Sequence, residues 1–268
     1  MNEILDTHKG TLYLVPTPLD FGCTGPELAA IDQLLPGATL AVASQLSHWI
    51  TENAKSTRAF LKRVEALRGL AASLQAQQIS ELPRAAHKKG DHAPDAAIDA
   101  AARALLAPAL AGHSIGLVSE AGMPAIADPG SSVVRAAHAL GLAVMPLSGP
   151  VSLMLALAAS GLNGQNFAFV GYAPQEATER ARRLRELEAL ALASGQTQIL
   201  IETPYRNAAL LQALLQTLQP HTRLAACFGL GLPAQQRCLS MAVLAWKRLL
   251  TSTHGLPLSL PCVFLIGR

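Results

Sequence analysis

Two turns rich in glycine and proline hold the residues of this chain whose types and spacing best suit ligand binding. The first, VSEAGMPAIADPG over residues 118–130, follows the apolar run SIGLVS and precedes the helical pattern SSVVRAAHALG. The second, SGPVS over residues 148–152, follows LAVMPL and precedes LMLALAAS. Each turn is predicted to follow a strand at the carboxyl edge of a sheet, where open α/β folds bind ligands. Two such loops, one strand–helix unit apart, can line a single crevice, which predicts a small-molecule site.

The alternative is that glycine and proline only shape tight turns here. Familiar catalytic signatures do not help to decide, because the chain has no GxGxxG, GxxxxGK[ST], HExxH or GxSxG motif.

The cysteines form no CxxC pair and have no histidine at metal-ligand spacing, so we predict reduced thiols of a cytoplasmic protein and no metal site. They are Cys23, Cys227, Cys238 and Cys262.

Composition sets wide limits on the partner. The 268 residues suffice for one large domain or two smaller ones, and a formal charge of +3 permits an anionic partner without requiring one. The amino terminus lacks an apolar signal segment, so no signal peptide is expected. The apolar stretch 141–162 is long enough to cross a bilayer, but Pro146, Gly149 and Pro150 interrupt it. We therefore predict a soluble protein with no membrane partner.

The elements that must position these turns can be placed from periodicity and turn signals. Strands are predicted over 11–17, 38–44 and 167–172, and within SIGLVS, LAVMPL, QAQQIS, TQILIETP, LAACFGLGL, CLSMAVLAW and PCVFLIGR. Helices are predicted over 26–35, with Thr24 or Gly25 near the cap, and within TENAKSTRAFLKRVEAL, 96–110, 177–193 and 208–218. A change in pattern near Asn163 predicts two domains, residues 1–162 and 163–268.

The motifs together identify a family. VPTP, VSEAGMPAIADPG, PLSGPVSLMLALAASGL, FVGYAPQ and IETPYR occur in this order along the chain. Their order and spacing resemble the tetrapyrrole methylase superfamily, specifically its ribosomal RNA small-subunit methyltransferase I branch. That branch typically carries VATPIGN, AEDTR, SDAGTPGISDPG, PGPSA followed by SASGL, and ESPHR.

The resemblance implies an α/β, two-domain tetrapyrrole methylase-like fold, in which each domain is a mixed sheet flanked by helices. It also implies S-adenosyl-L-methionine as cofactor, a homodimer, and ribose 2′-O-methylation of small-subunit ribosomal RNA or the 30S subunit. Two alternatives stay open. One is a porphyrinoid (tetrapyrrole) methyltransferase, and the other is a cofactor-binding paralogue without methyl transfer.

The same resemblance assigns residues. Cofactor binding maps onto Ser119, Glu120, Ala121, Gly122, Met123, Ile126, Gly149, Pro150, Val151 and Ser152. Substrate contacts map onto Lys55, Arg58 and Arg206, although Lys55 and Arg58 also fit the solvated start of a helix. The catalytic candidates are Glu120, Glu202 and Lys55, and the sequence does not select a base among them. Arginines at 180, 182, 183 and 185 could meet phosphates, but the interleaved glutamates favour a salt-bridged helix face.

This chain also departs from the pattern. Residues 20–23 replace the glycine–asparagine turn after VATP, and Glu120 and Met123 replace aspartate and threonine. AEDTR becomes TENAKSTR. An RELTK-like stretch becomes CFGLGLPAQQR, which holds no acid and no lysine. These differences predict a different substrate, or weak handling of the same one.

Overall fold

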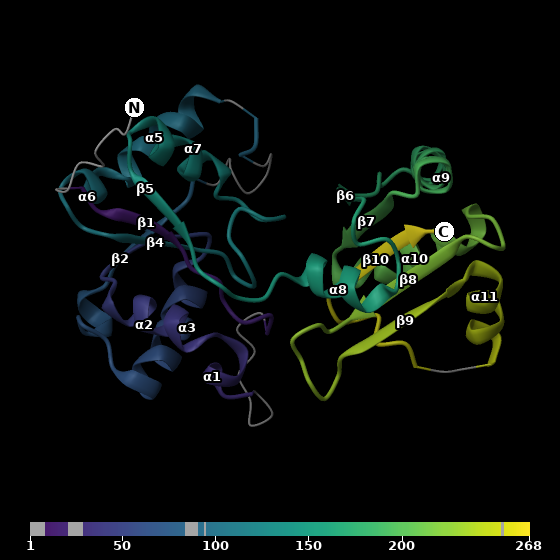
Figure 1. Ribbon diagram of the computed structural model, residues 1–268, viewed down its shortest axis with the longest axis horizontal. Coiled ribbons are helices and arrows are strands. Elements are labelled where there is room, and N and C mark those ends of the chain that lie inside the picture. Colours follow the sequence, from purple (N-terminus) through teal and green to yellow (C-terminus); the bar gives the residue numbers. More distant parts are fainter. Residues whose placement is uncertain (1–8, 21–28, 84–90, 94, 253–254) are drawn as a thin grey trace. The chain divides into compact units, whose positions relative to one another are not determined.

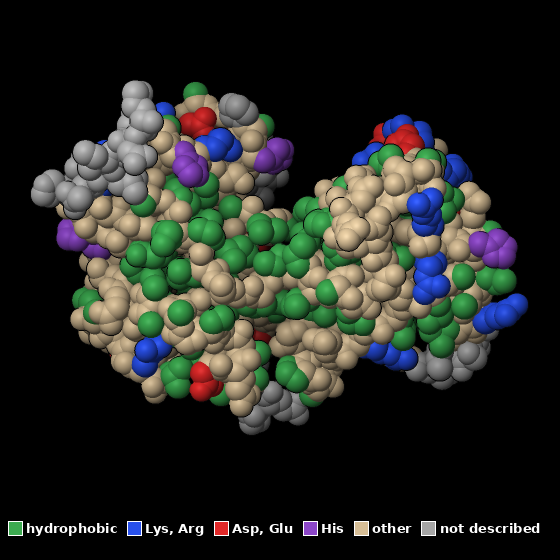
Figure 2. All heavy atoms as spheres, viewed as in Figure 1, with side chains coloured by type: hydrophobic (Ala, Val, Ile, Leu, Met, Phe, Trp, Pro, Cys, Tyr) green, Lys and Arg blue, Asp and Glu red, His purple; other side chains and the backbone are tan. Residues whose placement is uncertain are grey.

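The computed structural model describes residues 9–20, 29–83, 91–93, 95–252 and 255–268. The predicted cap at Thr24 or Gly25, and Cys23, lie outside these residues. The chain forms two compact units, Met1–Val151 and Ser152–Arg268, and each contains one five-stranded sheet (Figure 1). Charged side chains are sparse on the face shown in Figure 2, as expected for a chain with 15% charged residues.

The first unit is built on a parallel sheet. Its strands are β1 (Thr11–Leu14), β2 (His48–Thr51), β3 (Gln78–Glu81), β4 (Ile115–Val118) and β5 (Ala143–Pro146). Their order is β3-β2-β4-β1-β5, and every pairing is parallel. All four residues of β4 are buried, as expected for a central strand of a parallel sheet. The carboxyl ends of all five strands therefore lie at one edge.

Helices cover both faces of this sheet. They are α1 (Ile31–Leu34), α2 (Gly37–Gln45), α3 (Ala54–Arg68), the 3₁₀ turn Leu74–Ala76, α5 (Ala96–Leu105), α6 (Ala107–Leu110) and α7 (Ser131–Ala139). One core cluster joins Ile115 and Leu117 of the sheet to Val133 of α7. The other joins Trp49 to Phe60 and Leu61 of α3. Packing on both faces is why the strands read as short apolar runs instead of alternating patterns.

One predicted element of this unit is wrong, and another is confirmed only in part. The strand predicted over 38–44 is helix α2, which begins after Pro36 and buries Leu40 and Ala43. A short apolar run suits a buried helix as well as a strand, and the Ala- and Leu-containing TLAVAS has good helix propensity. The adjacent strand is β2 instead. In the helix predicted over 26–35, residues 26–28 lie outside the described residues, and only Ile31–Leu34 are helical in the remainder.

The second unit has a mixed sheet. Its strands are β6 (Phe167–Tyr172), β7 (Thr197–Glu202), β8 (Arg223–Phe228), β9 (Arg237–Ala242) and β10 (Cys262–Gly267), in the order β6-β7-β10-β8-β9. Only β6 and β7 pair in parallel. The helical segments are α8 (Ser152–Ser160), α9 (Ala177–Ser194), the 3₁₀ turn Pro204–Arg206, α10 (Asn207–Thr217) and α11 (Val243–Ser252). The stretch CLSMAVLAW, predicted as strand, is divided between β9 and α11.

Helix α8 packs on one face of this second sheet. Four residues lie directly opposite one another across neighbouring strands: Tyr172, Ile201, Val263 and Cys227. Residues opposite one another in a sheet share a face. Cys227 donates through Sγ to the backbone oxygen of Ala156 in α8, at 3.8 Å. This ladder of side chains therefore faces α8, while the main core of the unit lies on the other face.

A β-bulge puts three aromatic side chains of β6 on the α8 face. Phe167 and Phe169 alternate regularly along the strand, and the register then shifts so that Tyr172 lies opposite Ile201. Gly171, within the shift, has φ +71°, which glycine adopts without strain. The three aromatic residues are 39%, 38% and 58% exposed, respectively. β6 is an edge strand, so these side chains border open space.

The two-domain α/β class predicted from the sequence is confirmed. The expectation of a mixed sheet holds for the second unit, whereas the first sheet is parallel because crossovers, not hairpins, join its strands. The structure divides the chain at Ser152, where α8 begins. The sequence predicts the boundary after residue 162, just beyond the end of this helix. Because α8 packs on β8, β9 and β10, its contacts belong to the second unit.

Candidate functional site

The predicted cofactor loops meet at the carboxyl edge of the parallel sheet. Thr17, just beyond β1, forms a two-way backbone bridge with Gly122: Thr17 N donates to Gly122 O at 2.9 Å, and Gly122 N donates to Thr17 O at 3.1 Å. Gly122 has φ +83°, and a Cβ added there would lie 3.5 Å from the backbone oxygen of Pro150. The first loop is thus fixed to the end of β1 and lies against the second.

Gly149 permits an equally close approach on the other side of β1. A Cβ at this position would lie 2.3 Å from Cγ of Pro16, a contact that real structures do not tolerate. The neighbouring oxygen of Ser148 accepts a 2.7 Å hydrogen bond from Thr39 Oγ1 of α2. Glycine is therefore required by packing at Gly149. The two turns therefore pack closely on the end of β1 and on each other at this edge of the sheet.

Within the first loop, exposure differs from residue to residue. Ser119 is buried and donates through Oγ to the backbone oxygen of Ala121 at 3.4 Å. Met123 is half-buried, and Ile126 is 43% exposed. In the second loop Val151 is half-buried. These residues stay predictions as cofactor contacts. Ser152, which begins α8, lies in the second unit.

The start of α3 joins the same edge through one side chain. Asn53 Nδ2 donates to Glu120 Oε1 at 2.7 Å, while Asn53 Oδ1 accepts from the backbone nitrogen of Lys55 at 2.9 Å. Asn53 thus caps α3 and holds Glu120 in one position. Lys55 and Arg58 are exposed on the first turns of the helix. The arrangement brings Glu120 and Lys55 near one loop edge, as the sequence suggested, and leaves both cations accessible.

Asp128 belongs to this edge and escaped the sequence analysis. It lies in the first loop between Ala127, which has φ +65°, and Pro129. Burial and the charge of Glu52 raise the pKa of the Asp128 carboxyl to about 7, with Glu120 adding to the effect and a hydrogen bond from Ser119 opposing it. The available sequence signal was a carboxyl group inside the motif itself, in ADPG. The proline and glycine of the same segment indicate a turn.

Glu202 and Arg206 lie in the second unit and bind each other. Arg206 Nη2 lies 3.0 Å from Glu202 Oε2, and the Glu202 side chain is only 2% exposed. Its other oxygen, Oε1, accepts from the backbone nitrogen of Thr203 at 2.8 Å. Both carboxylate oxygens of Glu202 are therefore engaged, and Arg206 is paired with Glu202.

The basic run on α9 forms a salt-bridged helix face. Glu186 pairs with Arg182 at 2.8 Å and with Arg183 at 3.4 Å. Arg180 donates to the backbone oxygen of Gln175 at 3.1 Å. These partners agree with the interpretation favoured from the sequence.

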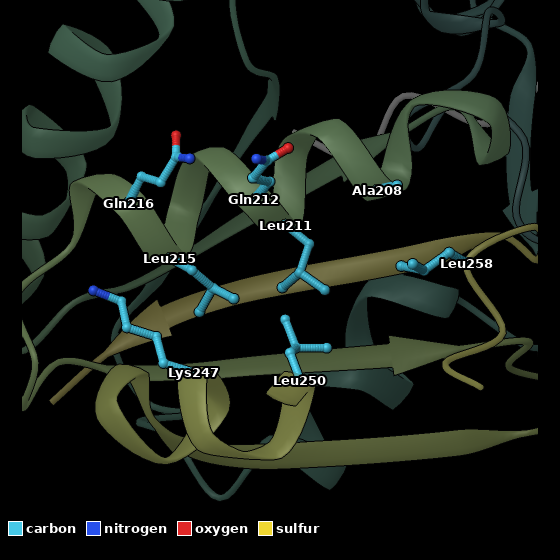
Figure 3. A pocket seen from close by; sticks show the side chains of 8 residues that line it. All are labelled: Ala208, Leu211, Gln212, Leu215, Gln216, Lys247, Leu250 and Leu258. Carbon is cyan, nitrogen blue, oxygen red and sulfur yellow. The ribbon is translucent and has the colours of Figure 1, made fainter. Parts of the chain in front are cut away.

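A hollow of about 400 Å³ lies between α10 and α11 in the second unit (Figure 3). Its floor is leucine, including Leu211 and Leu250, and Gln212, Gln216 and Lys247 stand at its rim. None of the predicted site residues lines it.

Over the described ranges, no three His, Cys, Asp or Glu side chains gather in a way that could hold a metal ion. No helix in that part of the chain has the length and apolar character needed to span a membrane.

Comparison with known proteins gives one family. The family model for Tetrapyrrole (Corrin/Porphyrin) Methylases matches residues 50–241. Ribosomal RNA small subunit methyltransferase I of Vibrio cholerae is 38% identical over 117 residues, which cover 44% of this chain and 39% of that protein. The protein of the same name from Halalkalibacterium halodurans is 30% identical over 210 residues, covering 78% of this chain and 61% of the relative. The chain therefore matches less than two thirds of the length of each relative.

A solved structure shares the fold. Uroporphyrin-III C-methyltransferase from Thermus thermophilus, solved in complex with S-adenosylhomocysteine, superposes with a TM-score of 0.51. The superposition covers 97% of this chain and 98% of the other, at 15% sequence identity. At this identity the likeness concerns the fold alone.

Proposed function

Because the chain belongs to the tetrapyrrole methylase family, we propose that it is an S-adenosylmethionine-dependent methyltransferase that methylates a ribose 2′-oxygen of small-subunit ribosomal RNA. One observation carries the proposal. The two glycine- and proline-rich motifs that suggested a ligand site meet at one sheet edge, through Thr17, Gly122 and Pro150. Two relatives that match parts of this chain carry the name ribosomal RNA small subunit methyltransferase I.

The loops of the first unit would hold the cofactor. Gly122 and Gly149 let the two loops pack closely on the end of β1 and on each other, and Ser119 and Glu120 supply polar groups there. When bound, S-adenosylmethionine supplies a methyl group activated by a positively charged sulfur. The task of the chain is then to align the two reactants and to receive the hydroxyl proton. Glu120 and Lys55 lie at the same edge and stay candidates, whereas Glu202 is engaged with Arg206.

Lys55 and Arg58 are the cations best placed for an RNA phosphate. Both are exposed at the start of α3, which begins directly beside the cofactor loops. In the second unit, the segment that replaces the RELTK-like stretch runs through the exposed turn between β8 and β9 and contains no acid and no lysine. Because these charged residues are absent, the second candidate is a cofactor-binding paralogue that transfers no methyl group.

The experiment is methyl transfer to assembled 30S particles from a bacterial strain that lacks its own methyltransferase I, with 2′-O-methyls mapped on the RNA. A new 2′-O-methyl is expected. Cofactor binding without transfer to 30S particles would favour the paralogue, and transfer to a porphyrin or corrin precursor instead would favour the porphyrinoid alternative. Gly149→Ala, with Gly164→Ala as its control, tests whether the activity depends on the close packing of the second loop on Pro16.

We also infer that two copies of the chain associate, in the cytoplasm where ribosomes lie. The α8 face of the second unit supports this inference. No Asp, Glu, Lys or Arg occurs from Ser152 to Gln175, and this segment exposes Met154 and Leu155 as well as Phe167 and Phe169. Two such faces could meet without burying a charge, as in apolar interfaces between identical subunits.

A further inference from the structure

Two cysteines lie directly opposite each other at one edge of the mixed sheet. In the antiparallel pairing of β8 with the edge strand β9, Cys227 is opposite Cys238. Residues opposite one another share a face of the sheet, and Cys227 Sγ donates to the backbone oxygen of Ala156 in α8 at 3.8 Å. Leu239, next to Cys238, packs against the core on the other face. Both thiols are therefore on the α8 face, side by side across one strand pair.

The backbone hydrogen bonds show which kind of pair this is. Along an antiparallel ladder, hydrogen-bonded and non-hydrogen-bonded pairs alternate. Val243 N donates to Thr222 O at 3.0 Å, so these two opposite residues form a hydrogen-bonded pair. In the continuous register, Cys227 and Cys238 lie five pairs further along, which is an odd number. They therefore form a non-hydrogen-bonded pair.

The strand on the other side of β8 gives the same result. Gly229 N donates to Pro261 O at 2.9 Å, so the backbone of Gly229 points towards β10. Backbone groups alternate between the two sides of a strand, and Cys227, two residues earlier, therefore also points away from β9. In a non-hydrogen-bonded pair the Cα atoms are about 4.5 Å apart, which is where side chains approach most closely. Disulfides join residues whose Cα atoms are about 4.4–6.8 Å apart, so this pair can be joined where it stands.

The third cysteine of the second unit is not a partner for either thiol. Cys262 is opposite Phe228, one position along β8 from Cys227, and its side chain lies in the core on the other face. Cys238 is half-buried, whereas Cys227 is buried. Burial, with a hydrogen bond to Cys238, raises the pKa of the Cys227 thiol. A reagent from solvent therefore reaches Cys238 first, and Cys227 is the thiol that waits behind it.

We propose that Cys227 and Cys238 form a reversible disulfide when hydrogen peroxide or an organic hydroperoxide reaches this edge of the sheet. The Cys238 thiolate attacks an oxygen of the hydroperoxide and its O–O bond breaks, which gives a sulfenic acid at Cys238. The departing hydroxide or alkoxide takes up the proton that the Cys238 thiol released. The Cys227 sulfur then attacks the Cys238 sulfur, and the S–S bond forms while the sulfenic hydroxyl leaves with the Cys227 proton as water. Two thiols lose two electrons, and the hydroperoxide gains them.

The bond would close the base of the turn between β8 and β9. The ten residues between the two cysteines, FGLGLPAQQR, make up most of the segment that replaces the RELTK-like stretch. Bonds within the turn hold it: Leu232 N donates to Gly229 O at 2.9 Å, and Gln236 N donates to Leu232 O at 2.8 Å. A covalent link at the base restricts the opening of this turn. In a reducing compartment a bond of this kind is transient, because cellular thiols reduce it by exchange.

Peptide mapping of the full chain tests the proposal without methyl donor or RNA. The chain is reduced, freed of reductant and treated with equimolar hydrogen peroxide under native conditions, after which the remaining thiols are alkylated. Trypsin cleavage after lysine and arginine then places each of the four cysteines in a peptide of its own: 10–55, 224–237, 238–247 and 249–268. We expect 224–237 joined to 238–247 as the main product, on a chain that runs as a monomer in a non-reducing denaturing gel. Dithiothreitol should separate the two peptides, and hydrogen exchange in the turn should be slower in the oxidised chain.

Variants assign the order of the two steps. Cys227→Ala should stop the reaction at a sulfenic acid on Cys238, which dimedone traps. Cys238→Ser should leave Cys227 unreacted, because Cys227 is buried. Cys262→Ala removes a thiol from the same sheet and should leave the linkage between 224–237 and 238–247 unchanged. Thermal melts establish that each variant folds.

The proposal fails if peroxide leaves all four thiols free, or if Cys238 is oxidised in the parent chain without becoming linked to Cys227. A main linkage to another peptide or between two chains would also overturn it. So would a linkage that forms only after urea unfolds the protein, because the native register would then not be its cause.

Discussion

Asn53 donates a 2.7 Å hydrogen bond to Glu120, and so joins the cap of α3 to the loop that follows β4. One amide side chain performs two tasks, since its oxygen caps the helix while its nitrogen holds the carboxylate. The possible RNA contacts on α3 and the proposed cofactor loop are therefore linked by a single residue.

Asn53→Ala should damage both tasks. We expect a loss of about 1 kcal/mol in the free energy of unfolding, the usual cost of a lost N-cap, and weaker cofactor binding because Glu120 is no longer fixed. Asn53→Asp is the matched control for the cap, because its carboxylate still accepts from Lys55 N. It should keep most of the stability but weaken the hold on Glu120 by repulsion. Urea unfolding and titration with cofactor measure the two effects, and equal stability loss in both variants would contradict the assignment.

Gly149→Ala should force the second loop away from β1. The added Cβ would meet the rigid ring of Pro16 at 2.3 Å, so we expect a destabilisation of about 1–3 kcal/mol and reduced cofactor affinity. Gly164→Ala is the control, because nothing lies within 4 Å of the added atom there. Urea denaturation gives the free energy of unfolding of both variants. A Gly149→Ala protein as stable as the Gly164→Ala protein would show that residue 149 does not lie this close to Pro16.

Asp91→Ala should be one of the more costly substitutions. The buried Oδ2 accepts from Gly130 N, Ser132 N and Ser132 Oγ at 2.7–2.9 Å, at the amino-terminal end of α7. Removing it leaves buried donors without a partner, and we expect a loss of about 2–4 kcal/mol. Asp95→Ala removes a comparable but exposed cap from α5 and should cost about 1 kcal/mol. Denaturant unfolding gives both values, and similar losses would show that burial adds nothing.

The two aspartates should have opposite effects on stability as pH changes. The hydrogen bonds from Ser132 and Gly130 outweigh burial and lower the pKa of Asp91, so its contribution is present above the ordinary aspartate range and is lost as pH falls through the lowered value. Asp128 has its pKa raised from 3.8 to about 7, so the unfolded chain loses this proton before the folded one does.

The free energy of unfolding should therefore decline through the Asp128 contribution as pH rises from about 4 to 7. Asp128→Asn should remove this decline and raise stability near neutral pH by about 2 kcal/mol. Chemical denaturation at several pH values measures the slope. A variant with the same slope as the parent chain would contradict the raised pKa.

Charging the aromatic face of β6 should separate the proposed dimer. Phe167→Glu with Phe169→Glu would place carboxylates of both copies at one interface, and sedimentation velocity should shift from dimer to monomer. Leu67→Glu changes an exposed leucine on α3, in the first unit, and should leave the association unchanged. A parent chain that sediments as a monomer would exclude the dimer directly.

The sequence was sufficient for the glycine- and proline-rich loops, because their turn chemistry is local. It failed at α2, where an apolar run of strand length is a buried helix, and period alone does not separate the two. Asp128 was missed for a different reason. Its environment depends on the register of β2 with β4, which brings Glu52 beside Ser119 from a distant part of the chain. No local pattern carries that information.

The left-handed alanines before Asp128 show that the first loop is held by its surroundings. Ala125 and Ala127, at φ +63° and +65°, each adopt a conformation that costs an alanine roughly 1–2 kcal/mol. Contacts elsewhere in the unit, among them the bridge between Thr17 and Gly122, offset this cost. Glycine adopts the same conformation without it, so a chain with glycine at both positions would need fewer such contacts to keep the loop in this shape.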